Sequence, residues 1–210
     1  MSLLSAGSWK DIAYLTPILF SATLLNQAYA ILVNFPRPSN GFAYPLHFAT
    51  LAVVSGASVL LSAPLALPFS RPNSLLQPVG NSLMAMSTAF FVWTTWTTQR
   101  GRLAAIFGGA TPGHIIDTGP FAIVRHPAYT SYILGWTGAL TALSAKNNEP
   151  WRVPALAACV LGLAGVYRTG AVMEEDQILG EDEQGENDQV KKEYKSYMTK
   201  VKYRWLPGFI

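Results

Sequence analysis

The chain has 210 residues, of which 50% are hydrophobic and only 13% charged, and its formal net charge is +3. So few charges over this length exclude an ordinary soluble domain and indicate that the lipid bilayer is the main solvent. One cysteine and three scattered histidines give neither a disulfide framework nor metal-ligand spacing. We therefore expect the bilayer as a partner, and neither a metal nor a nucleic acid.

Five stretches can cross the membrane or nearly so, because about 20 mostly apolar residues span about 30 Å of hydrocarbon. They are residues 12–32, 46–67, 79–98, 129–145 and 153–172. This pattern predicts an all-α integral membrane protein with about five transmembrane helices. The last two stretches are short, and we expect Trp136, Trp151 and Tyr167 to anchor them at the membrane interface. We expect the first stretch to be retained and not cleaved as a signal peptide.

The basic residues suggest an orientation for these five predicted spans. With five crossings, Arg37, the loop before residue 126 and the whole tail fall on one side, and together they hold most of the 15 Lys and Arg residues. Because basic loops favour the cytosolic side, we expect the C-terminal tail in the cytosol and the N-terminus opposite.

The two halves of the chain differ in their content of ionisable side chains. Residues 1–98 have few and are interpreted as a three-span scaffold, whereas residues 99–210 carry the chemistry, so we expect one integrated domain with two functional parts. Within the fourth stretch, Ser131, Gly135 and Ala139 recur at four-residue spacing, which predicts close helix packing. The loop at 99–124 is longer than a simple connection and is expected to be functional.

The tail divides into an acidic part and a basic part. Residues 174–193 hold most of the acidic side chains, and residues 180–188 are predicted to form a flexible insert. A helix is expected at 190–201 with an apolar side that includes Tyr194 and Tyr197, which would either contact the membrane or cover a cofactor. Its lysines favour an anionic membrane surface.

The junction Arg125-His126-Pro127-Ala128-Tyr129 carries the strongest local signal. Proline has no backbone N–H and holds the preceding residue extended, so a helix should begin at Pro127. The positive end of that helix, beside Arg125 and His126, predicts an anion site.

From residue 100 to 207 the chain resembles the isoprenylcysteine carboxyl methyltransferase family. The resemblance rests on the segment from His114 to Phe121, on the Arg125-His126-Pro127-Ala128-Tyr129 junction, on Glu174-Glu175, and on a tail with Glu193-Tyr194, Tyr197 and Tyr203-Arg204-Trp205-Leu206-Pro207. It implies S-adenosylmethionine as cofactor, in a cytosolic pocket built from the 99–130 loop and the C-terminal tail. The implied cofactor residues are His114, Ile115, Ile116, Asp117, Phe121, His126, Pro127, Ala128, Tyr129 and Glu174.

The same resemblance suggests the catalytic and substrate residues. We assign catalytic roles to Arg125, Arg168 and Glu175, and acceptor binding to Arg168 with Arg204 as its competitor. The family places its substrate arginine about one turn before the glutamates, whereas Arg168 lies six residues before Glu174. Seven residues still bring Arg168 and Glu175 to one helix face.

The leading functional hypothesis is methylation of the C-terminal carboxylate of a prenylated cysteine, in the endoplasmic reticulum membrane as the family implies. A carboxylate is ionised at neutral pH, so this reaction requires orientation and no general base. One alternative acceptor is a lipid amine or another small lipophilic molecule; an amine would need Glu174, Glu175 or His126 as base. Another alternative is an NADPH-dependent sterol-type reductase, because such enzymes share the RHP segment and the end of the tail.

Overall fold

The computed structural model describes residues 6–34, 43–67, 75–98, 115–146, 149–180 and 188–205. These residues form the helices α1 (Ala6–Tyr29), α2 (Ala43–Ser62), α3 (Leu76–Thr97), α4 (Pro127–Lys146), α5 (Arg152–Leu179) and α6 (Asp188–Lys200). A π-helical turn at Ala30–Asn34 continues α1, a 3-10 turn at Ala63–Ala66 continues α2, and another at Gly119–Ala122 precedes α4. The described residues contain no strand, which confirms the all-α prediction.

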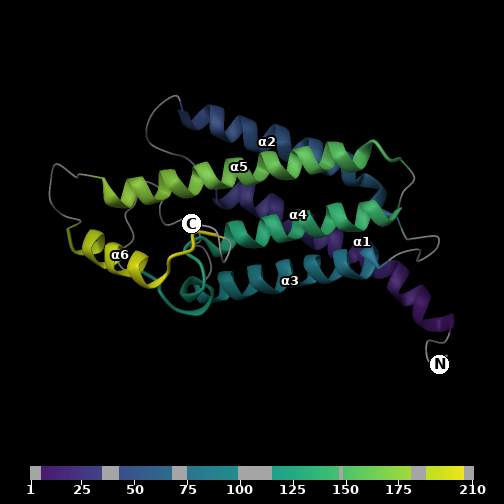
Figure 1. Ribbon diagram of the computed structural model, residues 1–210, viewed down its shortest axis with the longest axis horizontal. Coiled ribbons are helices and arrows are strands. Elements are labelled where there is room, and N and C mark those ends of the chain that lie inside the picture. The colour runs from purple at the N-terminus through teal and green to yellow at the C-terminus, as the bar shows by residue number, and fades with distance from the viewer. Residues whose placement is uncertain are drawn as a thin grey trace.

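The helices α1 to α5 lie side by side and alternate in direction (Figure 1). The starts of α2 and α4 and the ends of α3 and α5 meet at one end of this bundle, and α6 and the C-terminal segment lie there too. We call this the tail end. The N-terminus lies at the opposite end (Figure 1).

Three helices contain stretches that are long and apolar enough to cross a membrane, namely Tyr14–Leu32, Leu46–Ala66 and Arg152–Asp176. Leu25, Leu60 and Leu161 on these stretches are each more than 70% exposed, as lipid-facing side chains would be. The protein thus has the membrane character that its composition predicts, and three of the five predicted spans are supported. The other two predicted spans are the helices α3 and α4, whose mean hydropathy lies below that required of a candidate span.

The burial of α4 and α3 explains their lower hydropathy. Most of α4 is buried against neighbouring helices, so it needs little apolar surface toward lipid. On α3, the polar side chains of Gln77, Asn81 and Ser87 are buried, whereas Val92 and Trp96 are exposed. These three polar side chains of α3 therefore face protein and not lipid.

Helices α3 and α4 approach each other closely where both carry glycine. A Cβ atom on Gly80 would lie 2.6 Å from the backbone nitrogen of Ala142 and 2.7 Å from the carbonyl oxygen of Gly138. Both are backbone atoms, which cannot rotate away as a side chain can. This contact fixes the separation of the two helices and leaves space for no larger residue at Gly80.

The predicted small-residue series on α4 is also a packing surface. A Cβ atom on Gly135 would lie 2.9 Å from both Ser87 Oγ and Thr23 Cγ2, so α3 and α1 both approach this position. The hydroxyl of Ser87 donates to the carbonyl oxygen of Ser131 at 2.6 Å, and Ala139 is fully buried. The prediction of close helix packing is therefore confirmed.

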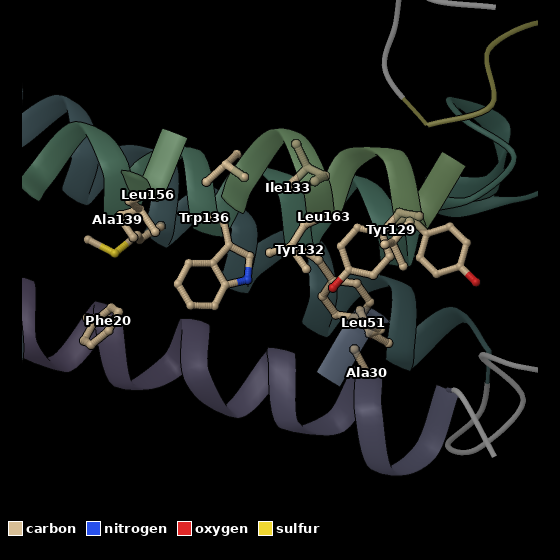
Figure 2. Close-up of a cluster of buried hydrophobic side chains, with 14 of the residues drawn as sticks. Phe20, Ala30, Leu51, Tyr129, Tyr132, Ile133, Trp136, Ala139, Leu156 and Leu163 are labelled. Atoms are coloured by element: carbon tan, nitrogen blue, oxygen red, sulfur yellow. The ribbon is translucent and has the colours of Figure 1, made fainter. Parts of the chain in front are cut away.

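The aromatic residues of α4 and α5 are placed differently from the prediction. Trp136 and Tyr167 are completely buried, and Figure 2 shows Trp136 in line with Tyr132 and Tyr129 along the core. The predicted role of Trp136 and Tyr167 as interface anchors is wrong, because each donates to Gln27 inside the bundle. Trp151 is 57% exposed and remains suited to the interface.

Two predicted segments fall largely outside the described residues. Of the acidic insert, only Gly180 and Asp188 are described. Of the long loop before α4, the part up to and including His114 is not described.

Candidate functional site

The segment after α6 lies across the start of α4. The backbone N–H of Arg125 donates to the carbonyl oxygen of Tyr203 at 2.9 Å, and that of His126 donates to Arg204 at 2.6 Å. The hydroxyl of Thr130 donates to the carbonyl oxygen of Trp205. The start of α4 and the tail, far apart in sequence, are thus hydrogen-bonded to each other.

Local sequence explains why the chain presents Arg125 and His126 at this place. Helix α4 begins at Pro127, as predicted. Upstream, Gly119 starts the 3-10 turn with a φ of 59°, and a Cβ atom there would lie 2.7 Å from Thr97 Oγ1. Only glycine fits this backbone conformation at so close an approach to α3.

Glu175 is the centre of a buried ion cluster. Its Oε1 atom accepts from Arg125 Nε at 2.9 Å and lies 3.1 Å from His126 Nε2, and its Oε2 atom accepts from Arg204 Nε at 2.9 Å. The carboxylate is 2% exposed. Glu175 therefore ties the end of α5 to the start of α4 and to the tail.

Glu174 engages the other side of the same imidazole. Its Oε2 atom lies 2.9 Å from His126 Nδ1, and the hydroxyl of Tyr129 donates to its Oε1 atom. Because each ring nitrogen of His126 faces a carboxylate, the arrangement favours the imidazolium form, in which both nitrogens donate. Burial alone would lower the pKa of His126, but hydrogen bonds to Glu174 and Glu175 and their negative charges outweigh it and raise that pKa above its ordinary value.

The cluster contains more positive than negative charge. With His126 protonated, three cations face the carboxylates of Glu174 and Glu175. The guanidinium of Arg125 is held by the protein, since its Nε atom donates to Glu175 and its Nη1 atom donates to the carbonyl oxygens of residues 201 and 202 at 2.9 Å each. Arg204 has a side chain that is 25% exposed and, within the described residues, contacts Glu175 only through Nε. The surplus positive charge and the remaining donors of Arg204 suit an additional anion.

Helix α6 covers the turn before α4. Tyr194 and Tyr197 are buried, and the hydroxyl of Tyr197 donates to the carbonyl oxygen of Phe121 at 2.7 Å. Burial raises the pKa of both tyrosines, so they remain neutral at physiological pH. Of the two interpretations of this apolar side, membrane contact is wrong, because Ile178 and its neighbours on the protein occupy it.

The structure brings together most of the predicted site residues. Those in direct contact within the cluster are Arg125, His126, Tyr129, Glu174, Glu175 and Arg204. Pro127 and Ala128 are buried in the first turn of α4, next to the cluster.

The residues predicted ahead of the turn lie at the edge of the site. Ile115 and Phe121 pack against the buried tyrosines of α6, and Ile116 is half-buried. Asp117 is exposed, and its carboxylate lies 3.8 Å from Lys200 Nζ, a weak pair at a surface position. His114 lies outside the described residues.

Arg168 stands apart from the cluster. It is exposed on α5, and among the described residues it has no hydrogen-bond or ion-pair partner. Two helical turns, about 10 Å along the axis, separate it from Glu175. Arg168 also lies within the candidate span Arg152–Asp176, at a level where lipid would surround the helix.

Sequence reasoning missed a second polar group, centred on Gln27 of α1. Its Oε1 atom accepts from Trp136 Nε1 at 2.9 Å and from the Tyr167 hydroxyl at 2.7 Å, and its Nε2 atom donates to Ser55 Oγ at 2.8 Å. The available signal was the pair of amide side chains Asn26 and Gln27 in a mostly apolar stretch, because polar groups at membrane depth are costly without a role.

Comparisons with known proteins add no further identification: no family model and no curated protein sequence matches the chain. The function must therefore be inferred from the geometry of the site together with the sequence motifs.

Proposed function

We propose that this protein is a membrane methyltransferase that transfers the methyl group of S-adenosylmethionine to the C-terminal carboxylate of a prenylated cysteine. The observation that carries this proposal is the contact between three motifs shared with the isoprenylcysteine carboxyl methyltransferases. Arg125 and His126, the pair Glu174-Glu175, and Arg204 of the tail come from separate parts of the chain and form one buried cluster. Chance resemblance in three short motifs does not require them to meet in space.

The residues present suit the groups of S-adenosylmethionine. When bound, this cofactor supplies an electrophilic methyl group on a positively charged sulfur. Glu174 is buried and takes one donor on each oxygen, from Tyr129 and His126, so its carboxylate is held in place to attract the sulfonium or the amino group. The surplus positive charge beside Arg204 suits the carboxylate of the cofactor or of the acceptor.

A carboxylate acceptor agrees better with the cluster than an amine. An ammonium group must lose a proton before it can attack, and this requires a base. His126 cannot act as that base because both of its nitrogens donate to carboxylates. The oxygens of Glu175 are held by Arg125 and Arg204. Those of Glu174 are held by Tyr129 and His126, so neither carboxylate is placed as a separate base. A carboxylate is already ionised and needs only to be oriented.

Two arginines, Arg168 and Arg204, are candidates for binding the carboxylate of the methyl acceptor. Arg168 is exposed at membrane level, where a lipid-anchored carboxylate would reach it, and its stem can lie along apolar surface. Arg204 lies in the cluster with part of its guanidinium exposed. We favour Arg168 for binding the acceptor, because Arg204 already forms an ion pair with Glu175.

We further propose that all five bundle helices cross the membrane, with the tail end in the cytosol and the protein in the endoplasmic reticulum. The alternating directions of α1 to α5 and the exposed apolar residues of α3, among them Val92 and Trp96, support five crossings. The cytosolic assignment rests on the distribution of basic residues.

Thermal unfolding of the detergent-solubilised protein with added cofactors tests the proposal. S-adenosylmethionine should raise the apparent Tm, whereas NADPH should not, because a ligand stabilises only the folded state that binds it. Glu174→Gln should remove most of this shift, and Glu149→Gln, at an exposed carboxylate at the other end of the bundle, should retain it. Stabilisation by NADPH alone would identify the reductase alternative.

The choice between the two arginines has its own test. Lysine keeps the charge but loses the planar fork that binds a carboxylate through two hydrogen bonds. Arg168→Lys should raise the KM for a farnesylcysteine analogue and leave cofactor affinity unchanged. If Arg204→Lys shows this defect and Arg168→Lys does not, the acceptor assignment passes to Arg204.

A further inference from the structure

A buried amide joins four helices below the ion cluster. Gln27 of α1 is 3% exposed and contacts Ser55 of α2, Trp136 of α4 and Tyr167 of α5. The indole N–H of Trp136 can only donate, so the oxygen of the Gln27 amide must face it and the nitrogen must face Ser55. The Tyr167 hydroxyl donates to that same oxygen, so its orientation is fixed as well.

Stacked rings connect this amide to the candidate cofactor residues. The ring of Tyr167 stacks on Tyr129, with centroids 5.2 Å apart and an interplanar angle of 21°. The ring of Tyr129 stacks in turn on His126, at 5.7 Å and 12°. Tyr129 donates to Glu174 through its hydroxyl. A continuous column thus leads from Gln27 through Tyr167 and Tyr129. It ends at His126, on which Tyr129 stacks, and at Glu174, to which Tyr129 donates.

We propose that Gln27 is a positioning residue for cofactor binding, which acts by fixing Tyr167 and, through it, the stacked Tyr129 that orients the Glu174 carboxylate. This inference rests on the proposed function, since it assigns Glu174 and Tyr129 to the cofactor. It gives the part of the chain before residue 98 a role in the site, where sequence reasoning assigned only a scaffold.

A purely architectural role would not require this arrangement. Residues of similar size without polar atoms pack well inside membrane bundles, whereas a buried amide costs free energy for each hydrogen bond that it does not make. Gln27 makes a hydrogen bond from each end of its amide. The amide of Gln77 on α3 is equally buried, yet its oxygen has no partner within the described residues. The amide with partners on both its oxygen and its nitrogen is the one that supports the aromatic column.

The test compares Gln27→Met with the matched variant Gln77→Met in the full-length protein. Both replace a buried glutamine by an apolar residue of similar length, but Gln77 lies at the end of the bundle opposite the ion cluster. Binding of labelled S-adenosylmethionine and the apparent Tm without cofactor are measured for each, with KM for cofactor and for acceptor and kcat. Gln27→Met should weaken cofactor binding by about tenfold, as expected when one buried hydrogen-bond acceptor is removed. Gln77→Met should lower the Tm and leave cofactor affinity unchanged.

A double-mutant cycle separates positioning from general destabilisation. Tyr167→Phe keeps the stacked ring but loses the hydroxyl that Gln27 holds, so it should weaken cofactor binding as well. The double variant Gln27→Met with Tyr167→Phe should be no weaker than the worse single variant, because both changes break the same link. Additive losses, or equal losses in Gln27→Met and Gln77→Met, would overturn the positioning role. Absence of cofactor binding in the wild type would instead refute the proposed function.

Discussion

Replacing Glu175 by glutamine is the sharpest perturbation of the ion cluster. Glutamine has the same size, but its amide nitrogen cannot accept a hydrogen bond and it carries no charge. One oxygen remains for Arg125 and His126, while Arg204 loses its acceptor. Three cations would then face only Glu174.

The expected loss follows from the burial of these groups. Breaking one side of a buried ion pair costs about 3–5 kcal/mol, and loss of a single hydrogen bond to a charged group about 1.5–3 kcal/mol. The side chain of Arg125 is 5% exposed and cannot regain water, but that of Arg204 is 25% exposed and can. We therefore expect the free energy of unfolding to fall by about 3 kcal/mol, where these two ranges meet.

Thermal unfolding and hydrogen exchange measure this loss. About 3 kcal/mol corresponds to a Tm decrease of about 6–12 °C for a chain of this size. The amides of Arg125 and His126, which donate to the tail, should exchange faster in the variant. Glu149→Gln is the control, because Glu149 forms an ion pair of similar length with Arg152 but is 43% exposed. Such a pair contributes about 0–1 kcal/mol, so equal Tm changes in both variants would refute the reasoning.

Three further predictions concern pH, packing and the acidic insert. Although burial alone lowers the pKa of His126, its carboxylate partners raise it overall, so its contribution to stability is complete below about pH 6.5 and is lost as the pH rises through the raised pKa. The Tm of the wild type should therefore fall above neutral pH, and His126→Gln should flatten this dependence. Gly80→Ala should lower the Tm because its Cβ atom meets backbone, whereas Gly165→Ala, with open space around it, should not. Shortening the insert at 180–188 should leave the methyl-transfer rate within a few-fold, because that segment has no apolar side to bury; loss of all activity in folded protein would contradict this.

Local rules predicted the helices and the charged motifs well. The start of α4 follows from the fixed geometry of Pro127, and the close contact of α4 follows from small residues at helical spacing, including Gly135. Arg125, Glu175 and Arg204 were found as separate motifs, each with ionisable groups that are rare in this chain. Their contact with one another was not visible in the sequence, because it depends on how the tail crosses the start of α4.

Features that depend on packing between helices could not be predicted from the sequence. The side chain of Gln27 has partners on other helices: it accepts from Trp136 of α4 and Tyr167 of α5. Without these contacts, the two aromatic residues resembled interface anchors. Arg168 and Glu175 share a helix face by spacing, yet only Glu175 is covered by the tail. Spacing along the helix therefore predicted on which face each of these side chains lies, but not whether the side chain is buried.

Transfer of a labelled methyl group tests the central claim most directly. The purified protein is incubated with labelled S-adenosylmethionine and, in separate reactions, with a farnesylcysteine analogue, with phosphatidylethanolamine, and with no acceptor. We predict label only in the farnesylcysteine product, as an ester that alkali releases, and at a rate that does not rise between about pH 6 and 9 because the acceptor carboxylate is already ionised. Label in the phosphatidylethanolamine product, or a rate that rises with pH as a base loses its proton, would contradict the carboxyl methyltransferase assignment.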